Sequence, residues 1–151
     1  MTQRVDLATV MDRLAIDDLV TRYAVAVDDA DWDGYRALFT PDGRVDYRDS
    51  GGIEAPAAAG ADWLAKAMGT FPVRQHLIVN RRLRLQDLGG YPGDGADVQA
   101  DYLAVLRTDT GEELSSGGRY AIAAVRTDDG WRLNGVVSRE KWRRAAGALP
   151  G

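Results

Sequence analysis

Apolar residues recur at helical spacing through the first 40 residues of the chain. Apolar residues spaced three and four positions apart predict one helix that ends at the acidic turn 28–31. Asp31 is the expected N-cap of a second, shorter helix. Thr40–Gly43 has the composition of a turn, and residues 45–47 alternate as a short strand does. A third helix is predicted over Gly60–Gly69.

Beyond residue 75 the pattern changes from helical spacing to alternation. A strand over 76–85 would place His76 and Asn80 on one face and Arg81 on the other. A loop rich in glycine, proline and aspartate is expected at Gly89–Gly95. Three further strands are expected, joined by turns: Val98–Arg107, Gly118–Thr127 and Trp131–Lys141.

Helices followed by long antiparallel strands are typical of an α+β protein. The sheet must be covered on one face, and the helices are available to cover it. A curved sheet wrapped around the N-terminal helices and an apolar pocket fits this pattern. No repeat or linker divides the chain, so residues 1–151 are expected to form a single domain.

Composition excludes several classes of site. The 151 residues include no cysteine and one histidine, which excludes disulfide scaffolds, thiolate zinc sites and two-histidine metal motifs. A formal net charge of −4 argues against a general nucleic-acid binder. No secretory signal and no membrane span are apparent. We therefore expect a cytoplasmic protein that uses no metal or other cofactor and binds a small molecule, not nucleic acid or a membrane.

Two residues are candidates for acid–base chemistry. His76 is the only side chain of the chain whose ordinary pKa lies near neutrality, although a hydrogen-bonded structural histidine is the alternative. Asp28 lies at the C-terminal end of a predicted helix, where the helix dipole disfavours a carboxylate. A carboxylate at a position that the helix dipole disfavours indicates a functional constraint. The alternative is that Asp28 is a solvated residue of the turn.

Tyr23 lies on the apolar stripe of the first helix and Tyr47 on the short strand. Each either packs in the core or offers its hydroxyl to a ligand carbonyl. Arg139 continues the alternation of Trp131, so it is expected at the rim of the cavity or inside it as the partner of an anion or oxyanion. Arg143 is expected to be an ordinary surface charge.

Several motifs of the chain resemble those of SnoaL-like proteins, which belong to the nuclear-transport-factor-2-like superfamily. They are Arg22–Asp28 with Asp31-Trp32-Asp33, Leu38–Gly43, Gln75-His76, Gly118-Arg119-Tyr120 and Asp129–Arg132. The resemblance covers roughly Leu7–Trp142. It implies a cone-shaped α+β fold and a homo-oligomer, either a dimer or a trimer. The superfamily includes dehydratases, isomerases, polyketide cyclases, epoxide hydrolases and non-catalytic binders.

Active-site residues of two dehydratase families that the chain resembles match several of the candidate residues. Asp28, Tyr47 and His76 match active-site residues of the fungal scytalone dehydratases. Tyr23, Asp28, His76 and Arg139 match those of the bacterial bile-acid dehydratases. The chain departs from the fungal pattern at Val27, where a second tyrosine is absent, and it has no second catalytic histidine.

The resemblance therefore implies a cofactor-independent lyase, a dehydratase that removes a proton α to a carbonyl of a small, largely apolar substrate. Asp28 would fix the tautomer of His76, and Tyr47 would stabilise the enolate with help from Tyr23 or Arg139. Further substrate-binding residues are expected at Trp63, Tyr102 and Tyr120. An aldol-type polyketide cyclase or an isomerase with the same dyad is an alternative. A non-catalytic ligand-binding or assembly module is another.

Overall fold

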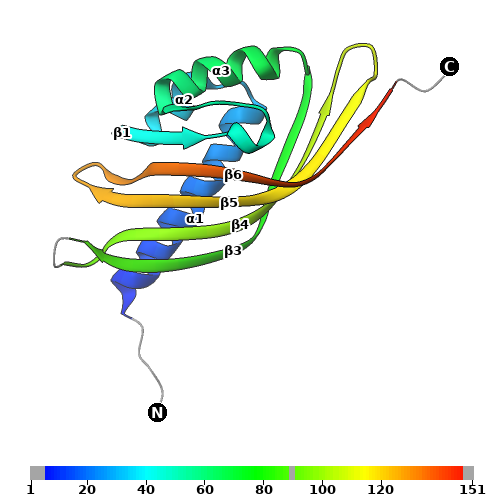
Figure 1. Cartoon of the computed structure of the whole chain (residues 1–151). Coiled ribbons are helices and arrows are strands. Elements are labelled where there is room, and N and C mark those ends of the chain that lie inside the picture. Colours follow the sequence, from blue (N-terminus) through cyan, green and yellow to red (C-terminus); the bar gives the residue numbers. More distant parts are fainter. Residues whose placement is uncertain (1–5, 89–90, 148–151) are drawn as a thin grey trace.

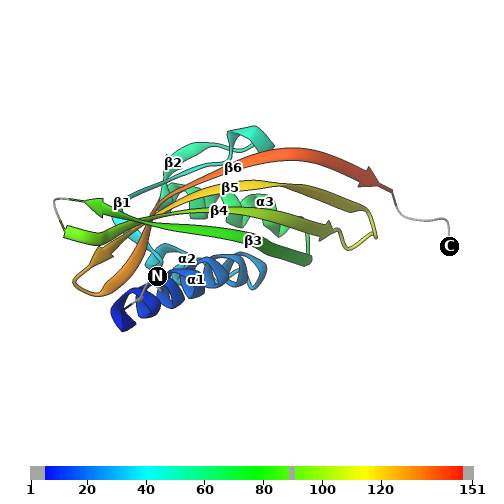
Figure 2. The ribbon, with the colours of Figure 1, turned by 90° about the horizontal axis from the view of Figure 1, so that it is seen from below.

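The computed structural model describes residues 6–88 and 91–147 as one curved sheet with helices on one side (Figures 1 and 2). The elements in chain order are α1 (Leu7–Asp28), α2 (Trp32–Ala37), β1 (Phe39–Asp46), the 3-10 turn η1 (Arg48–Ser50), β2 (Glu54–Pro56), α3 (Ala57–Gly69), β3 (Val73–Leu88), β4 (Tyr91–Arg107), β5 (Glu113–Thr127) and β6 (Gly130–Ala146). The sheet order is β2-β1-β6-β5-β4-β3, and β1 and β6 are its one parallel pair in the described part of the chain. The predicted α+β class and curved sheet are confirmed.

The core lies between the concave face of the sheet and the C-terminal half of α1. Asp6 caps α1, because its side chain accepts a hydrogen bond from the Thr9 amide at 2.8 Å. The apolar stripe of α1 is buried from Ile16 onward, whereas Leu7 and Leu14 are exposed. The apolar packing of α1 against the sheet therefore begins at Ile16, whereas before it Asp12 contacts the sheet through hydrogen bonds from Arg126 and Trp131. Among the described residues, none of the helices has the length and apolar character that crossing a bilayer requires.

Several element boundaries differ from those expected. The turn expected at Thr40–Gly43 lies within β1, where the register against β6 shifts between Phe39 and Arg44. Most of the loop expected at Gly89–Gly95 belongs to β4, and its first two residues lie outside the described part of the chain. At both places the pairing register shifts, so each turn-like segment is an irregularity within a strand whose flanking residues stay paired.

A bulge in β3 reverses the expected faces of its second half. Two residues of β3 follow Val79 before pairing resumes at Arg82, and Asn80 has a positive φ of 51°. Asn80 therefore points away from the helices and donates to Asp101 at 3.2 Å, while Arg81 turns inward and donates to Asp17 on α1 at 2.9 Å. The prediction that Asn80 shares a face with His76 is wrong.

A similar bulge in β6 corrects the position expected for Arg139. Ala124 pairs with Leu133 and Ala123 with Gly135, so Asn134 is one extra residue on β6. The inner face that holds Leu133 continues at Ser138 rather than at Arg139. Arg139 is exposed on the outer face of the sheet.

Helix α3 approaches β1 closely at a glycine, which gives a test of the packing. A Cβ on Gly60 would overlap a methyl group of Val45, whereas a Cβ on Gly69 in the same helix would meet nothing within 4 Å. Gly60→Ala is expected to lower the free energy of unfolding by about 1–3 kcal/mol through overpacking. Gly69→Ala is the matched control and is expected to leave it unchanged or raise it slightly. Urea denaturation measures both, and equal stability of the two variants would contradict this packing.

Candidate active site

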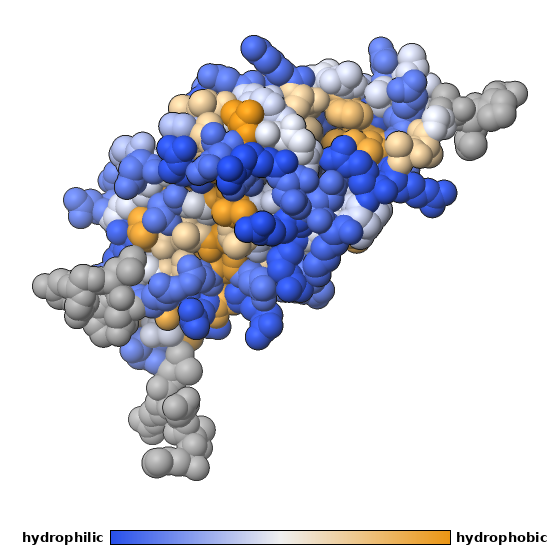
Figure 3. Space-filling view, in the orientation of Figure 1, coloured by the Kyte–Doolittle hydropathy of each residue, from blue (hydrophilic) through white to orange (hydrophobic). Residues whose placement is uncertain are grey.

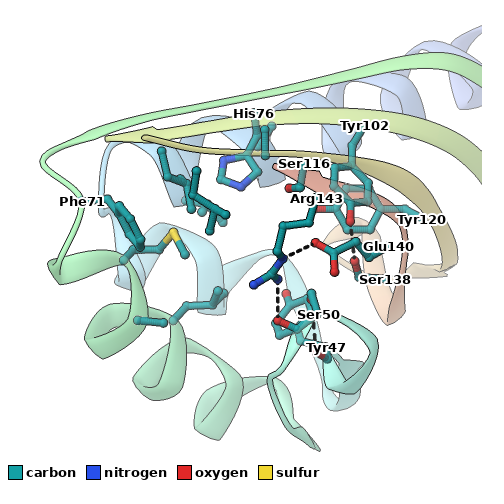
Figure 4. Close-up of a pocket in the computed structure, with 18 of the residues that line it drawn as sticks. Tyr47, Ser50, Phe71, His76, Tyr102, Ser116, Tyr120, Ser138, Glu140 and Arg143 are labelled. Carbon is teal, nitrogen blue, oxygen red and sulfur yellow. Dashed lines mark hydrogen bonds and ion pairs between the residues drawn. The ribbon is translucent and has the colours of Figure 1, made fainter. Parts of the chain in front are cut away.

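A largely apolar pocket of about 330 Å³ opens between helices α1 and α3 and the concave face of the sheet. Apolar and aromatic side chains form most of its wall (Figure 4). Figure 3 shows apolar side chains gathered at the surface between the end of α3 and the β4–β5 hairpin. The residues that line the pocket are Tyr23, Ala24, Val27, Tyr47, Ser50, Trp63, Leu64, Ala67, Met68, Phe71, His76, Tyr102, Ala104, Leu106, Leu114, Ser116, Tyr120, Ser138, Glu140 and Arg143.

The last residue of α1 is hydrogen-bonded twice to the beginning of β3. Oδ1 of Asp28 lies 2.6 Å from Nδ1 of His76, and Oδ2 accepts the backbone N–H of His76 at 2.9 Å. Both side chains are largely buried, at 19% exposure for Asp28 and 13% for His76. The structure thus brings together the two residues selected as acid–base candidates.

The carboxylate determines which nitrogen of His76 carries the proton. An ionised carboxylate only accepts hydrogen bonds, so Nδ1 is the donor to Asp28. In the neutral ring Nε2 then holds a free lone pair. Because the ring borders the pocket, this nitrogen is available to a bound molecule (Figure 4).

Arg74 explains how a carboxylate is tolerated at the end of α1. Its guanidinium donates to the backbone carbonyls of Asp28, Met68 and Phe71, at 3.1, 3.2 and 2.8 Å. A cation at a helix C-terminus offsets the helix dipole that disfavours Asp28. Arg74 lies two residues before His76 on β3. Because alternate residues of a strand share a face, this spacing was the signal in the sequence that could have placed Arg74 on the same face as His76.

Three tyrosine hydroxyls form a buried chain beside the pocket. The Tyr47 hydroxyl is hydrogen-bonded to that of Tyr35 at 2.7 Å and, through a shorter contact, to that of Tyr23. Tyr35 is fully buried, and in the described part of the chain Tyr47 is its one hydrogen-bond acceptor. Sequence reasoning placed Tyr23 and Tyr47 near a ligand but missed Tyr35, which reaches the pair from α2.

The burial of Tyr35 gives the Tyr35–Tyr47 hydrogen bond a direction. A buried hydroxyl without an acceptor costs about 1–3 kcal/mol, so Tyr35 donates to Tyr47. The Tyr47 oxygen has two lone pairs, so the hydrogen bond between Tyr47 and Tyr23 can run in either direction. In both arrangements one proton, on Tyr23 or on Tyr47, remains for a molecule in the pocket, which both tyrosines line.

Burial raises the pKa of Tyr23, Tyr35, Tyr47 and Tyr120 above the ordinary value of 10.0. All four hydroxyls are therefore protonated donors at neutral pH. Burial also raises the pKa of Tyr102, whose hydroxyl lies 3.5 Å from that of Ser138.

Of the remaining expected substrate-binding residues, Trp63, Tyr102 and Tyr120 line the pocket and Arg139 does not. Trp63 stacks on Tyr47 with ring centroids 6.1 Å apart, and Tyr102 packs on Tyr120 at 4.6 Å, all on the pocket wall. Arg139 does not reach the pocket, because the bulge at Asn134 turns it outward. Arg143, expected on the surface, is exposed there and also borders the pocket.

The family of the chain follows from comparison with known proteins. A family model described as the SnoaL-like domain matches residues 8–137. The chain belongs to this SnoaL-like family. The uncharacterized protein Rv2910c of Mycobacterium tuberculosis is 34% identical over 129 residues, which are 84% of each chain.

Solved structures share the fold of this SnoaL-like protein. A type 2 hexachlorocyclohexane dehydrochlorinase, LinA, matches with a TM-score of 0.81 and 18% identity, over 96% of this chain and 95% of that one. A scytalone dehydratase-like protein from Novosphingobium aromaticivorans matches with a TM-score of 0.73 and 22% identity, over 93% and 95%. The fold is therefore the nuclear-transport-factor-2-like cone, in which small-molecule-converting enzymes occur.

The Asp28–His76 bond leads to a spectroscopic prediction. Long-range ¹⁵N spectra of the single histidine, taken where the ring is neutral, are expected to show one tautomer with Nδ1 protonated. In Asp28→Asn an NH2 group, which cannot accept a hydrogen bond, replaces one carboxylate oxygen. The remaining oxygen can accept from either the ring or the backbone N–H of His76, so a mixture of tautomers is expected. Asp18→Asn on the exposed side of α1 is the matched control. A tautomer that does not respond to Asp28→Asn would contradict the hydrogen bond.

The buried tyrosines lead to a prediction about alkaline stability. Above about pH 10 the tyrosines of the unfolded chain lose protons while those of the folded chain keep them, so the free energy of unfolding falls as pH rises. Each such tyrosine contributes up to about 1.4 kcal/mol per pH unit. Tyr35→Phe is expected to make this fall shallower, as measured by urea denaturation between about pH 8 and 11. An unchanged slope would show that Tyr35 ionises normally in the folded state.

Proposed function

We propose that this SnoaL-like protein is a cofactor-independent lyase that dehydrates a small, largely apolar β-hydroxycarbonyl compound. The observation that carries the proposal is the Asp28–His76 hydrogen bond, which leaves a histidine nitrogen facing a mostly apolar pocket. A positioned base in a site with little water is the arrangement that proton abstraction from carbon needs.

In the first step Nε2 of His76 removes a proton from the carbon next to the carbonyl group. The C–H electron pair moves into the carbonyl, which becomes an enolate. Asp28 holds the ring in one tautomer and stabilises the imidazolium that forms. Positioned acid–base catalysis of this kind is worth about 10²–10⁴ in rate.

The tyrosine chain supplies the donor for the enolate oxygen. Because Tyr35 donates to Tyr47, one proton of the Tyr23–Tyr47 pair is left for a ligand. Hydrogen bonds in a chain polarise one another and strengthen the last donor. A preorganised oxyanion donor contributes about 10²–10³ in rate. Tyr23 and Tyr47 both border the pocket, as an oxyanion donor must.

In the second step the enolate electrons form the carbon–carbon double bond as the β-hydroxyl leaves. The imidazolium of His76 gives its proton to this hydroxyl, so water is released and the histidine is neutral again. These contributions suffice for a substrate whose α-proton a carbonyl already makes acidic. They fall short of what an unactivated alcohol requires.

The shared fold is consistent with this reaction class. A dehydratase and a dehydrochlorinase both carry out eliminations, and the structural neighbours of this chain include a protein of each name. The assignment to this chain depends on the pocket geometry, because identities of 18% and 22% indicate the fold alone.

Asp28→Asn and His76→Ala are each expected to lower the dehydration rate by at least about 100-fold without unfolding the protein. The rate is measured on β-hydroxy ketones such as the aldol adduct of acetone and benzaldehyde, whose enone product absorbs in the ultraviolet. Asp18→Asn makes the same substitution on an exposed side chain of α1 and should retain full activity. Full activity of Asp28→Asn or His76→Ala would exclude the dyad mechanism.

Product analysis separates dehydration from the other reactions that begin with the same proton transfer. Loss of one water from the substrate supports the lyase, whereas a product of unchanged mass indicates an aldol-type cyclisation or an isomerisation. Absence of α-deuterium exchange in heavy water for every carbonyl compound that binds would indicate a non-catalytic binding module.

A further inference from the structure

An ion pair at the end of β6 borders the same pocket and has no part in the proposed proton transfer. Nε of Arg143 donates to Oε1 of Glu140 at 2.8 Å, and Nη2 of Arg143 donates to the backbone carbonyl of Ser50 at 3.0 Å. Figure 4 shows the guanidinium extending into the cavity between Glu140 and Ser50. The pair therefore connects the sheet to the η1 turn across the pocket.

A second bulge in β6 turns Arg143 toward the pocket. Gly118 pairs with Glu140 and Gly117 with Trp142, so Lys141 is an extra residue. Trp142 consequently packs on the outer face, where a Cβ on Gly117 would overlap its indole ring. Bulges beside functional sites commonly redirect a side chain in this way.

The pair retains unused hydrogen-bonding capacity next to the cavity. Within the described part of the chain, hydrogen bonds engage Nε and Nη2 of Arg143 and one oxygen of Glu140, leaving Nη1 and the second oxygen free. Glu140 is only 16% exposed, so its free oxygen is poorly served by bulk water. One donor and one acceptor side by side match a hydroxyl group, which can accept from Arg143 and donate to Glu140.

Charge at this place disfavours an anionic ligand. Asp49 accepts the backbone N–H of Glu140 at 2.6 Å, so a second carboxylate lies beside the Glu140–Arg143 pair without itself lining the pocket. Arg139 and Lys141 lie on the outer face and do not neutralise the excess. A ligand carboxylate that approached Arg143 would be repelled by Glu140 and Asp49.

We propose that Glu140 and Arg143 bind a neutral hydroxyl group of the ligand and exclude carboxylates, so that the pocket takes uncharged, hydroxyl-bearing compounds that are otherwise apolar. The inference rests on the proposed function in assigning this pocket to a small molecule, but not on any reaction. Apolar walls formed by Met68, Phe71 and Leu106 receive the rest of the ligand.

Equilibrium binding of three naphthalene probes tests this inference: β-naphthol, its methyl ether and β-naphthoate. The wild-type protein is expected to bind the naphthol at least about tenfold more tightly than either of the others. In Glu140→Gln, Arg143 loses its carboxylate partner, so affinity for β-naphthoate should rise at least about tenfold. Arg143→Met should lower naphthol affinity and give no gain for the naphthoate.

Glu54→Gln is the matched control, because it removes the same charge from β2 at a residue that does not line the pocket. It should leave all three affinities unchanged. A Glu140→Gln variant that gains no affinity for β-naphthoate, or a Glu54→Gln variant that gains as much, overturns the inference. Asp28→Asn should keep the wild-type order of affinities, so loss of the reaction and loss of this selectivity are separate outcomes.

Discussion

The junction between the end of α1 and the beginning of β3 is the constraint on which the site depends. Asp28 is bonded through both carboxylate oxygens to His76, and Arg74 bonds the carbonyl that ends the helix. The same contacts that hold the helix against the sheet therefore select the tautomer of the histidine. An isolated Asp28 at this position would be disfavoured by the helix dipole, so Arg74 and His76 together explain why it is stable there.

The tyrosine chain depends on that junction for its alignment. Tyr23 lies on α1 about one turn before Asp28, while Tyr35 and Tyr47 come from α2 and the end of β1. Three segments thus place one buried hydroxyl each beside the others, where an unpaired hydroxyl is costly. Donation from the fully buried Tyr35 to Tyr47 leaves one proton of the Tyr23–Tyr47 pair for a ligand, and both of these tyrosines line the pocket.

Much of the fold and part of the site followed from the sequence. Helical spacing located α1, α2 and α3, and alternation located the long strands, because these patterns depend on which residues are buried. His76 and Asp28 were identifiable as a lone histidine and a misplaced carboxylate. Arg139 was misplaced because a bulge shifts the phase of β6 by one residue without any change in composition around Asn134. Tyr35 was missed because helical spacing marks it only as a buried residue of α2, while its hydroxyl partner Tyr47 lies in another element.

The bulges explain why the pocket combines an apolar wall with polar groups at defined places. A strand of perfect alternation from Trp131 would carry Arg139 to the inner face and leave Glu140 outside. The extra residue at Asn134 reverses this and brings Ser138 and Glu140 inside, and the extra residue at Lys141 then adds Arg143. Each shift moves every later side chain of the strand to the opposite face. Two single-residue insertions in β6 therefore determine which charges face the ligand, while the helices and the other strands keep their packing.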